Sequence, residues 1–193
     1  MNAPNSNKII PILETERLIF RPWVESDAAE CYRYCSDPEV GRMGGWATHN
    51  SIEDSLKVIR DVFMKPEVYA IILKETGLPI GCIGLMFGEK TTFAEKPDEC
   101  EIGYWLGVPY WGQGMMTEAV KLLLHHAFMD LEMPKVWAGY YDGNQRSKRV
   151  QEKCGFHFIR VQDNIEVPSL HEIRSSNVNC ITRDEWMNRN LSE

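Results

Sequence analysis

One stretch of the chain, residues 99–128, constrains the fold more than any other. Residues 99–106 alternate as a β-strand does, and residues 112–128 carry apolar side chains at the spacing of an amphipathic helix. The segment between them contains glycines and a proline, a composition that lets a strand deliver the backbone into the open N-terminus of a helix. Such a helix end is predicted to suit a phosphate.

Composition indicates one folded domain. The 193 residues are 44% hydrophobic and 25% charged, enough to bury a sizeable core. We expect a loose polar segment over residues 1–8 and a single domain over residues 9–193. The net charge of -7 argues against a nucleic-acid surface. The N-terminus has neither the pattern of a signal peptide nor that of a membrane span, so a cytoplasmic location and no membrane partner are expected.

The six cysteines lack the paired C-x-x-C spacing of a zinc or redox site. Cys31 and Cys35 are four residues apart and share a helix face, but two soft ligands without nearby partners make a poor metal site. His125 and His126 are adjacent and point to different faces of a helix. We therefore expect reduced thiols packed in the core and no metal site.

The order of the predicted elements indicates a mixed sheet of the α+β or α/β class. Three consecutive strands precede alternating helices and strands, and the first two of these three flank turn residues as an antiparallel hairpin does. Residues 41–46 are expected to form a glycine-rich loop. Helices are predicted at 26–37, 51–63, 112–128, 144–153 and 184–190, and strands at 16–21, 68–73, 80–87, 99–106, 135–140, 156–161 and 176–182. Ser26 is expected to cap the first helix.

The glycines at the start of the 112–128 helix are the first candidate site. Gly112 and Gly114 let the backbone approach a ligand without a Cβ in the way. A pyrophosphate would be held mainly by main-chain amides, which explains how an acidic protein could bind a polyanion. A bare G-x-G is more often a tight turn without a ligand, so the motif needs support. The amides concerned are those of Gln113, Gly114, Met115, Met116 and Thr117.

The strand before these glycines offers a candidate general base. Period two places Glu101 and Trp105 on one face and Ile102 and Tyr104 on the other. A carboxylate that is partly desolvated in the middle of a strand has a raised pKa, which suits a base working near neutrality. An exposed strand glutamate with no role is an equally good interpretation of Glu101 alone.

A third segment, residues 144–156, adds two polar side chains. Asn144 and Ser147 are one helical turn apart, so both can face one groove. Taken separately, Asn144 is more simply a helix cap and Ser147 a surface hydroxyl.

Together the three segments resemble the GCN5-related N-acetyltransferase (GNAT) superfamily, and specifically its RimJ/RimL-like branch. The acetyl-CoA signature of that family is Gln/Arg-x-x-Gly-x-Gly/Ala. Gly114 matches its first glycine, while Trp111 stands at the Gln/Arg place and Met116 at the Gly/Ala place, where we expect a tighter fit around the phosphate. The resemblance rests on residues 15–22, 101–106, 110–119, 152–156 and 181–186 and on the pair Asn144-x-x-Ser147.

The resemblance implies how acetyl-CoA would bind. The central, mostly antiparallel sheet would splay between the fourth and fifth predicted strands, with a bulge from Leu106 to Val108. Main-chain groups of Leu106 and Val108 would bind the pantetheine arm in that gap, and an amide near the bulge would polarise the thioester. The amides of residues 113–117 would bind the pyrophosphate, and Asn144 would face the same cofactor.

The resemblance also implies direct transfer to an amine. Glu101 would remove the proton of the amine, and Ser147 would protonate the leaving thiolate, with Tyr140 or Tyr141 as alternative acids. Trp46, within the expected loop, would line the acceptor side together with Glu101. A protein N-terminus and a small-molecule amine both remain open as acceptors, and no metal is needed.

Two other functions remain open from the sequence. An acyl-CoA-binding or regulatory module could keep the cofactor groove with little catalysis. Met116 at the Gly/Ala place of the signature leaves this function open. A nucleotide-phosphate enzyme could use the same glycine turn, although the chain lacks a G-x-x-x-x-G-K-[ST] motif. The branch often forms dimers, so a homodimer is open as well, with the last β pair as one surface.

Overall fold

The computed structural model describes residues 10–190, so the segment expected to be loose, residues 1–8, lies outside the described residues. Eight strands form one sheet in the order β1-β2-β3-β4-β5-β6-β8-β7, with β5 and β6 parallel and every other neighbouring pair antiparallel. The expected mixed sheet is confirmed. The strands are β1 (Leu13–Glu14), β2 (Leu18–Pro22), β3 (Val68–Leu73), β4 (Leu78–Phe87), β5 (Cys100–Leu106), β6 (Lys135–Tyr141), β7 (His157–Val167) and β8 (Glu172–Thr182).

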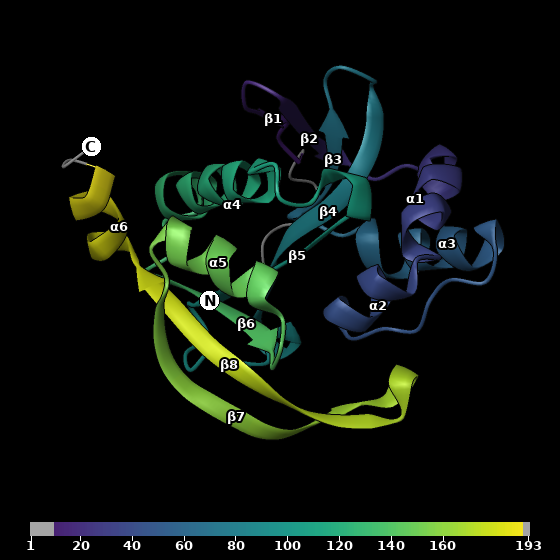
Figure 1. Cartoon of the computed structure of the whole chain (residues 1–193). Coiled ribbons are helices and arrows are strands. Elements are labelled where there is room, and N and C mark those ends of the chain that lie inside the picture. Colours follow the sequence, from purple (N-terminus) through teal and green to yellow (C-terminus); the bar gives the residue numbers. More distant parts are fainter. Residues whose placement is uncertain (1–9, 191–193) are drawn as a thin grey trace.

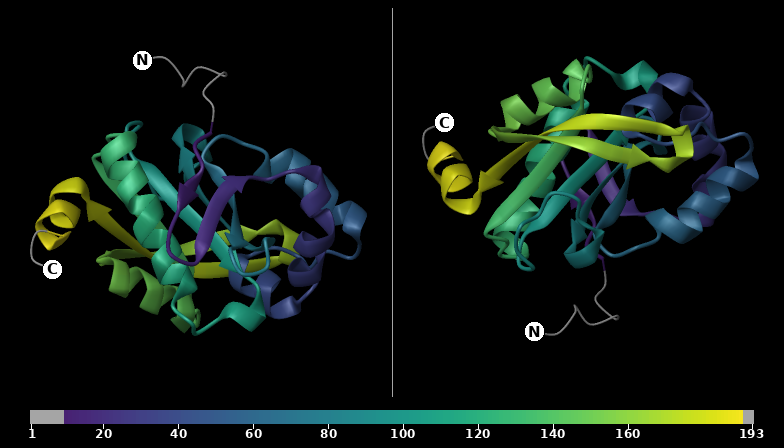
Figure 2. Two further views of the ribbon diagram at one scale, coloured as in Figure 1. Left: turned by 90° about the horizontal axis from the view of Figure 1, so that it is seen from above. Right: turned by 90° about the horizontal axis from the view of Figure 1, so that it is seen from below.

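Helices cover the two faces of this sheet (Figure 1). In both views of Figure 2 the green helices α4 and α5 lie on the opposite side of the strands from the blue helices α1 to α3. Within the described range, no helix has the length and apolar character needed to cross a bilayer. The α-helices are α1 (Ala28–Cys35), α2 (Pro38–Gly44), α3 (Ile52–Val58), α4 (Met115–His125), α5 (Gln145–Cys154) and α6 (Arg183–Asn190).

Alternating residues of the central strands supply two separate cores. On β5, Ile102 and Leu106 pack in the core under α4, whereas Trp105 packs in the core under α1. On β4, Ile83 packs in the core under α4 and Cys82 packs in the core under α1. The period-two prediction for this strand is confirmed, and the two faces of the sheet can therefore carry different binding sites.

The sheet opens between β5 and β6. These strands pair only at Cys100↔Val136 and Glu101↔Trp137, whereas β4 pairs with β5 in unbroken register from Phe87↔Cys100 to Gly81↔Leu106. The predicted splay is thus present. The bulge predicted from Leu106 to Val108 is wrong. The strand ends at Leu106 and a 3₁₀ turn over Val108–Tyr110 follows, because Pro109 favours the start of a helical turn.

Two N-terminal predictions also need correction. The first helix begins at Ala28 and Ser26 does not cap it, because Asp27 is drawn to Arg21 by two hydrogen bonds of 2.7 Å. The expected loop at 41–46 is mostly helix. Asp37 accepts the amide of Glu39 at 2.9 Å, and Pro38 at the first position starts α2, which continues to Gly44.

The β7–β8 hairpin is longer than predicted and forms one edge of the sheet, at the bottom of the view in Figure 1. Near its tip, Ser169 donates to the Gly45 carbonyl at 3.3 Å and Arg174 donates to the Arg42 carbonyl at 2.6 Å. The hairpin therefore ties the end of α2 to the other half of the sheet.

Candidate active site

A continuous cleft of about 2370 Å³ follows the opening between β5 and β6. Its lining includes Met115 and Ser147 from the α4 and α5 face, and Trp46 and Trp105 from the opposite face, with Glu101 between them. Single small-molecule pockets usually measure about 300–1000 Å³. The cleft is therefore large enough for two ligands that meet at the gap in the sheet.

The N-terminus of α4 opens into this cleft with free amides. Gly112 and Gly114 adopt φ values of 76° and 79°, a left-handed conformation that a glycine tolerates at little cost. In the described range, the amides from Gly114 to Thr117 donate to no other residue, and the first amide bonded within the helix is that of Glu118. The predicted row of amide donors is present, and the helix dipole adds positive potential beside it.

Two side chains of this turn, those of Met116 and Gln113, are engaged elsewhere. Met116 is 8% exposed and packs in the core, so the tighter fit around a phosphate stays a prediction. Gln113 donates its side-chain amide to the Pro109 carbonyl at 2.8 Å. Neither of these two side chains therefore occupies the free main-chain amides of the turn.

An ion pair that the sequence analysis did not identify braces the turn. Arg17 donates to the Gln113 carbonyl at 3.1 Å and to Glu118 at 2.7 Å, and Thr15 also donates to Glu118. Burial alone would raise the pKa of Glu118, but the hydrogen bonds from Thr15 and Arg17 outweigh it and lower the pKa. Residues 15–17 belonged to the family resemblance, yet no local pattern linked them to a helix a hundred residues later.

The end of β5 offers one main-chain donor. The carbonyls of Leu106 and Val108 are engaged by Trp111, which donates its indole N–H at 2.7 Å and its amide at 3.1 Å. The Gly107 amide donates back to Ile80 at 2.9 Å. The Val108 amide, in contrast, donates to no other described residue, so of the main-chain groups predicted here it is the best placed to polarise a carbonyl.

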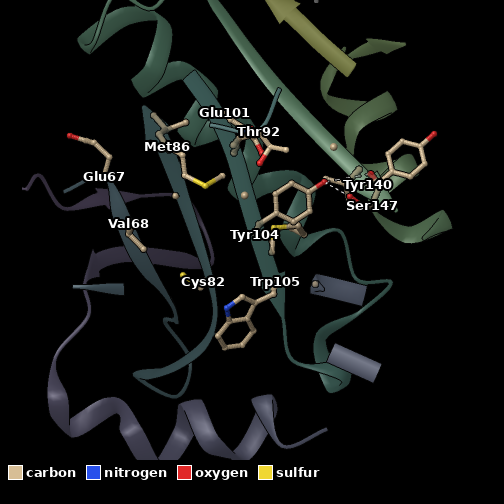
Figure 3. A pocket seen from close by; sticks show the side chains of 18 of the residues that line it. Glu67, Val68, Cys82, Met86, Thr92, Glu101, Tyr104, Trp105, Tyr140 and Ser147 are labelled. Carbon is tan, nitrogen blue, oxygen red and sulfur yellow. Dashed lines mark hydrogen bonds between the residues drawn. The ribbon is translucent and has the colours of Figure 1, made fainter. Parts of the chain in front are cut away.

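Glu101 is held in the middle of β5 with one oxygen engaged. The residue is 6% exposed, and its Oε2 accepts the amides of Thr92 at 2.6 Å and Phe93 at 3.1 Å (Figure 3). Burial raises the pKa of Glu101 and the two amides offset part of that rise. The expected direction of the shift is thus present. Oε1 accepts from no other residue in the described part of the chain and remains available to a substrate.

Asn144 caps α5 and Ser147 lies in the first turn of that helix. The Asn144 side chain accepts the Ser147 amide at 3.1 Å and so acts as the helix cap. Ser147 Oγ lies 2.9 Å from the Tyr104 hydroxyl and accepts the side-chain amide of Gln151 at 3.2 Å. Gln151 is anchored in turn by Asn179 at 2.6 Å.

Tyr104 is a site residue that the sequence analysis missed. Figure 3 shows its hydroxyl directed at Ser147, whereas the ring of Tyr140 points away from both. Tyr141 stacks under Arg174, 5.0 Å from its ring centre. Burial raises the pKa of Tyr104 to about 12. The alternation of side chains along the strand had placed Tyr104 and Glu101 on opposite faces of the sheet. They line one cleft because the sheet is open beside β5.

Aromatic rings form the wall of the cleft on the α1–α3 face. Trp105 packs edge-on against Trp46 and tilted against Phe63, each with ring centres 6.3 Å apart. The indole N–H groups of Trp46 and Trp105 are buried and have no partner among the described residues. Trp46 therefore lines the cleft on the α1–α3 face, and its role in acceptor binding stays a prediction. Trp105 is a second wall residue that the sequence analysis did not name as a ligand contact.

Comparison with known proteins agrees with this geometry. The chain is 29% identical over 153 residues to the "Uncharacterized N-acetyltransferase YoaA" of Bacillus subtilis (strain 168), an alignment covering 77% of this chain and 84% of that protein. A GNAT-family acetyltransferase from Bacillus anthracis superposes with a TM-score of 0.78 at 21% identity, covering 90% of this chain and 99% of that one. The ribosomal-protein-S5-alanine acetyltransferase from Vibrio fischeri gives 0.68 at 18% identity, covering 91% and 98%.

The two solved structures share the fold at low identity, so the family assignment rests on the sequence match. The family model described as an acetyltransferase (GNAT) domain matches residues 17–157, which is more than half of the chain. The chain therefore belongs to the GNAT family of N-acetyltransferases.

Proposed function

We propose that this protein transfers an acetyl group from acetyl-CoA to an amine by direct attack of the amine on the thioester. One observation carries the proposal. A single cleft connects the free amides at the start of α4, on one face of the sheet, with the buried carboxylate of Glu101 through the gap beside β5. A polyanionic donor and a cationic acceptor would each meet the group that suits it.

On the donor side, the amides of residues 113–117 would bind the pyrophosphate. The pantetheine arm would extend along the open edge of β5 past Leu106. There the Val108 amide, which has no described partner, would donate to the thioester carbonyl. Asn144 would contribute by capping α5 beside this path, because its side chain is engaged by the Ser147 amide.

On the acceptor side, Glu101 would accept a proton from the ammonium form of the amine, directly or through a water molecule. The neutral amine would then attack the thioester carbon, and collapse of the tetrahedral intermediate would break the carbon–sulfur bond. The leaving thiolate would take a proton from the hydroxyl pair of Tyr104 and Ser147, which lie 2.9 Å apart on the donor face. The attacking nitrogen would lose its second proton to solvent, and a proton from solvent would restore the hydroxyl pair. The amide product then carries the acetyl group.

We further propose a protein N-terminal amine as the first acceptor to test, with small-molecule amines as the alternative. The likeness to a structure named a ribosomal-protein-S5-alanine acetyltransferase supports this choice and the RimJ/RimL-like branch. The indole wall of Trp46 and Trp105 suits a short apolar side chain next to the amine.

The test is a thiol-release assay with acetyl-CoA over a panel of peptides with free N-termini, polyamines and aminoglycosides. We expect thiol release with one acceptor class and acetylated product by mass spectrometry. Calorimetric titration with acetyl-CoA and with ATP provides the control. Binding of ATP but not of acetyl-CoA would contradict the proposal, whereas acetyl-CoA binding with no turnover would favour the acyl-CoA-binding module.

We also propose a homodimer that pairs through the edge strand β7. Phe158 and Val161 on β7 are 57% and 48% exposed, so apolar side chains lie on the strand at the edge of the sheet. Light scattering after gel filtration would measure the mass, and Phe158→Lys is expected to yield monomers. A wild-type monomer at micromolar concentration would contradict the dimer.

A further inference from the structure

The helix α1 and the segment after α2 bring together three side chains that the proposed reaction does not use. Cys31 Sγ and Cys35 Sγ lie 3.9 Å apart on one face of α1. A ring nitrogen of His49 lies with them, and the three ligand atoms are all within 4.8 Å of one another. The residues are 1%, 0% and 9% exposed. Sequence spacing had revealed only the two cysteines, because His49 approaches them through the tertiary fold.

The spacing of these atoms matches a thiolate metal site. Zinc binds thiolate sulfur at about 2.3 Å with tetrahedral angles, so two sulfurs on one zinc ion lie roughly 3.8 Å apart. The Cys31–Cys35 separation of 3.9 Å agrees with that value. Three protein ligands leave the fourth tetrahedral position of the zinc ion to a water molecule.

The imidazole of His49 is held in place by two hydrogen bonds of the residue. The completely buried Ser55 places its Oγ 2.7 Å from His49 Nδ1, which fixes the orientation of the ring. The His49 amide donates to the Cys35 carbonyl at 3.0 Å, so the backbone of the ligand is also tied to α1. The site is therefore built before any ion enters.

Charge distinguishes between the candidate ions. Two thiolates and a neutral imidazole carry two negative charges, which neutralise a divalent cation. A buried site with no net charge avoids the desolvation cost of a buried ion. A monovalent Cu(I) would leave one negative charge. Magnesium and calcium prefer oxygen ligands. We propose that Cys31, Cys35 and His49 form a zinc site that fixes the segment after α2 against α1.

The consequence concerns the acceptor wall. His49 follows Trp46 by three residues in the same segment. A zinc ion bound to His49 would hold this segment in place and with it the tryptophan that packs edge-on against Trp105. The site would thus have a structural role outside the cleft.

The test uses the full chain, reduced, stripped with a chelator and titrated with Zn²⁺ or Co²⁺. We expect uptake of one equivalent, release of the two thiol protons, and the absorption of tetrahedral thiolate-bound Co²⁺. Zn²⁺ should also raise the unfolding temperature of the wild-type protein in a concentration-dependent way. Cys31→Ser and His49→Gln should abolish the cobalt spectrum. Cys180→Ser, which changes a buried cysteine on β8, is the matched control and should keep it.

A further variant keeps the proposal testable if a ligand variant fails to fold. His49→Cys retains three soft ligands and should bind Co²⁺ with a stronger sulfur-to-metal band. Folded wild-type protein that takes up neither Zn²⁺ nor Co²⁺ would overturn the proposal. An unchanged cobalt spectrum in Cys31→Ser would do so as well, and uptake of Cu(I) alone would overturn the charge argument. None of these readouts depends on acetyl transfer.

Discussion

The two faces of the sheet are built from different kinds of contact. On the α4 face, the candidate donor site consists of main-chain amides at one glycine turn, and side chains such as Gln113 are turned away from it. On the α1–α3 face, the wall of the cleft consists of side chains from three distant segments, Trp46, Phe63 and Trp105. From this comparison we expect donor binding to depend on backbone conformation and acceptor choice to depend on side-chain identity.

Glu101 lies between the two faces, and its substitution should have the largest effect on activity. Glu101→Gln removes the base but keeps an oxygen that can accept the amides of Thr92 and Phe93. We expect kcat/KM to fall roughly a hundredfold to ten-thousandfold, with acetyl-CoA affinity unchanged, as measured by thiol release and calorimetry. An unchanged rate and pH profile would show that Glu101 is not the base.

The raised pKa of Glu101 gives a control for this variant. Because burial destabilises the ionised form in the folded protein, the carboxylate lowers stability above its unfolded pKa, and this penalty disappears as falling pH protonates it. Glu101→Gln should therefore be at least as stable as wild type near neutral pH, measured by urea unfolding. A large loss of stability would mean that the activity loss reflects misfolding.

The next largest effect is expected from the hydroxyl pair on the donor face. Tyr104→Phe should lower kcat by roughly a hundredfold if Tyr104 supplies the proton, and Ser147→Ala should lower it less. In both variants the acetyl-CoA affinity should stay near wild type, because the hydroxyls bond to each other and not to the amides of α4. Tyr140→Phe is the matched control, since its ring points away from Ser147 (Figure 3). A greater loss in Ser147→Ala would reverse the assignment.

Gly114→Ala tests the donor face by itself. A left-handed conformation costs a residue with a Cβ about 1–2 kcal/mol, and space around the Cβ is not limiting because the nearest atom is 3.8 Å away. We expect acetyl-CoA binding to weaken about tenfold with the acceptor KM unchanged, measured by calorimetry and initial rates. Weaker acceptor binding alone would break the division between the faces.

Trp46→Ala tests the acceptor face in the same way. Loss of one aromatic contact is worth about 1 kcal/mol, so the acceptor KM should rise roughly fivefold while the acetyl-CoA KM stays constant. Trp46→Phe keeps a ring and should restore most of the affinity. A change confined to the acetyl-CoA KM would contradict the position of Trp46 on the acceptor side.

The same contrast explains what could be predicted from sequence. The turn at Gly112–Gly114, the Asn144 cap and the face of Glu101 depend on local propensity and periodicity, and these predictions agree with the structure. The Arg17–Glu118 brace and the Tyr104–Ser147 pair join residues that are far apart in sequence. Their contacts depend on tertiary packing, which period and spacing do not encode.

The elements whose predictions were corrected also depend on contacts that residue type alone does not reveal. The Ser26 cap and the 41–46 loop were predicted from residue type alone. The Arg21–Asp27 ion pair and the Asp37 cap instead determine where α1 and α2 begin. The gap beside β5 was expected from the family resemblance, and no residue pattern within β5 or β6 indicates where the two strands stop pairing. The family resemblance therefore supplied the global feature, and local chemistry supplied the details.

The smallest effect is expected from substitution of His126, a buried residue behind the donor face, and it concerns the free energy of unfolding. It lies 3.0 Å from Glu67 and 2.6 Å from Asp130. Burial opposes its charge, but the hydrogen bonds to Glu67 and Asp130 outweigh burial and raise its pKa. The raised pKa means that the folded state binds this proton more tightly. The stabilisation is complete below the unfolded pKa and is lost as pH rises through the folded one.

His126→Gln should therefore cost about 1–2 kcal/mol of unfolding free energy in slightly acid buffer. The difference from wild type should shrink as the buffer is made alkaline, which urea unfolding at a series of pH values would measure. His125→Gln, a change at the neighbouring exposed position, is the control. Both Michaelis constants should stay at their wild-type values, because His126 contacts neither the α4 amides nor the aromatic wall. A pH-independent loss would mean that the ring packs there without its charge.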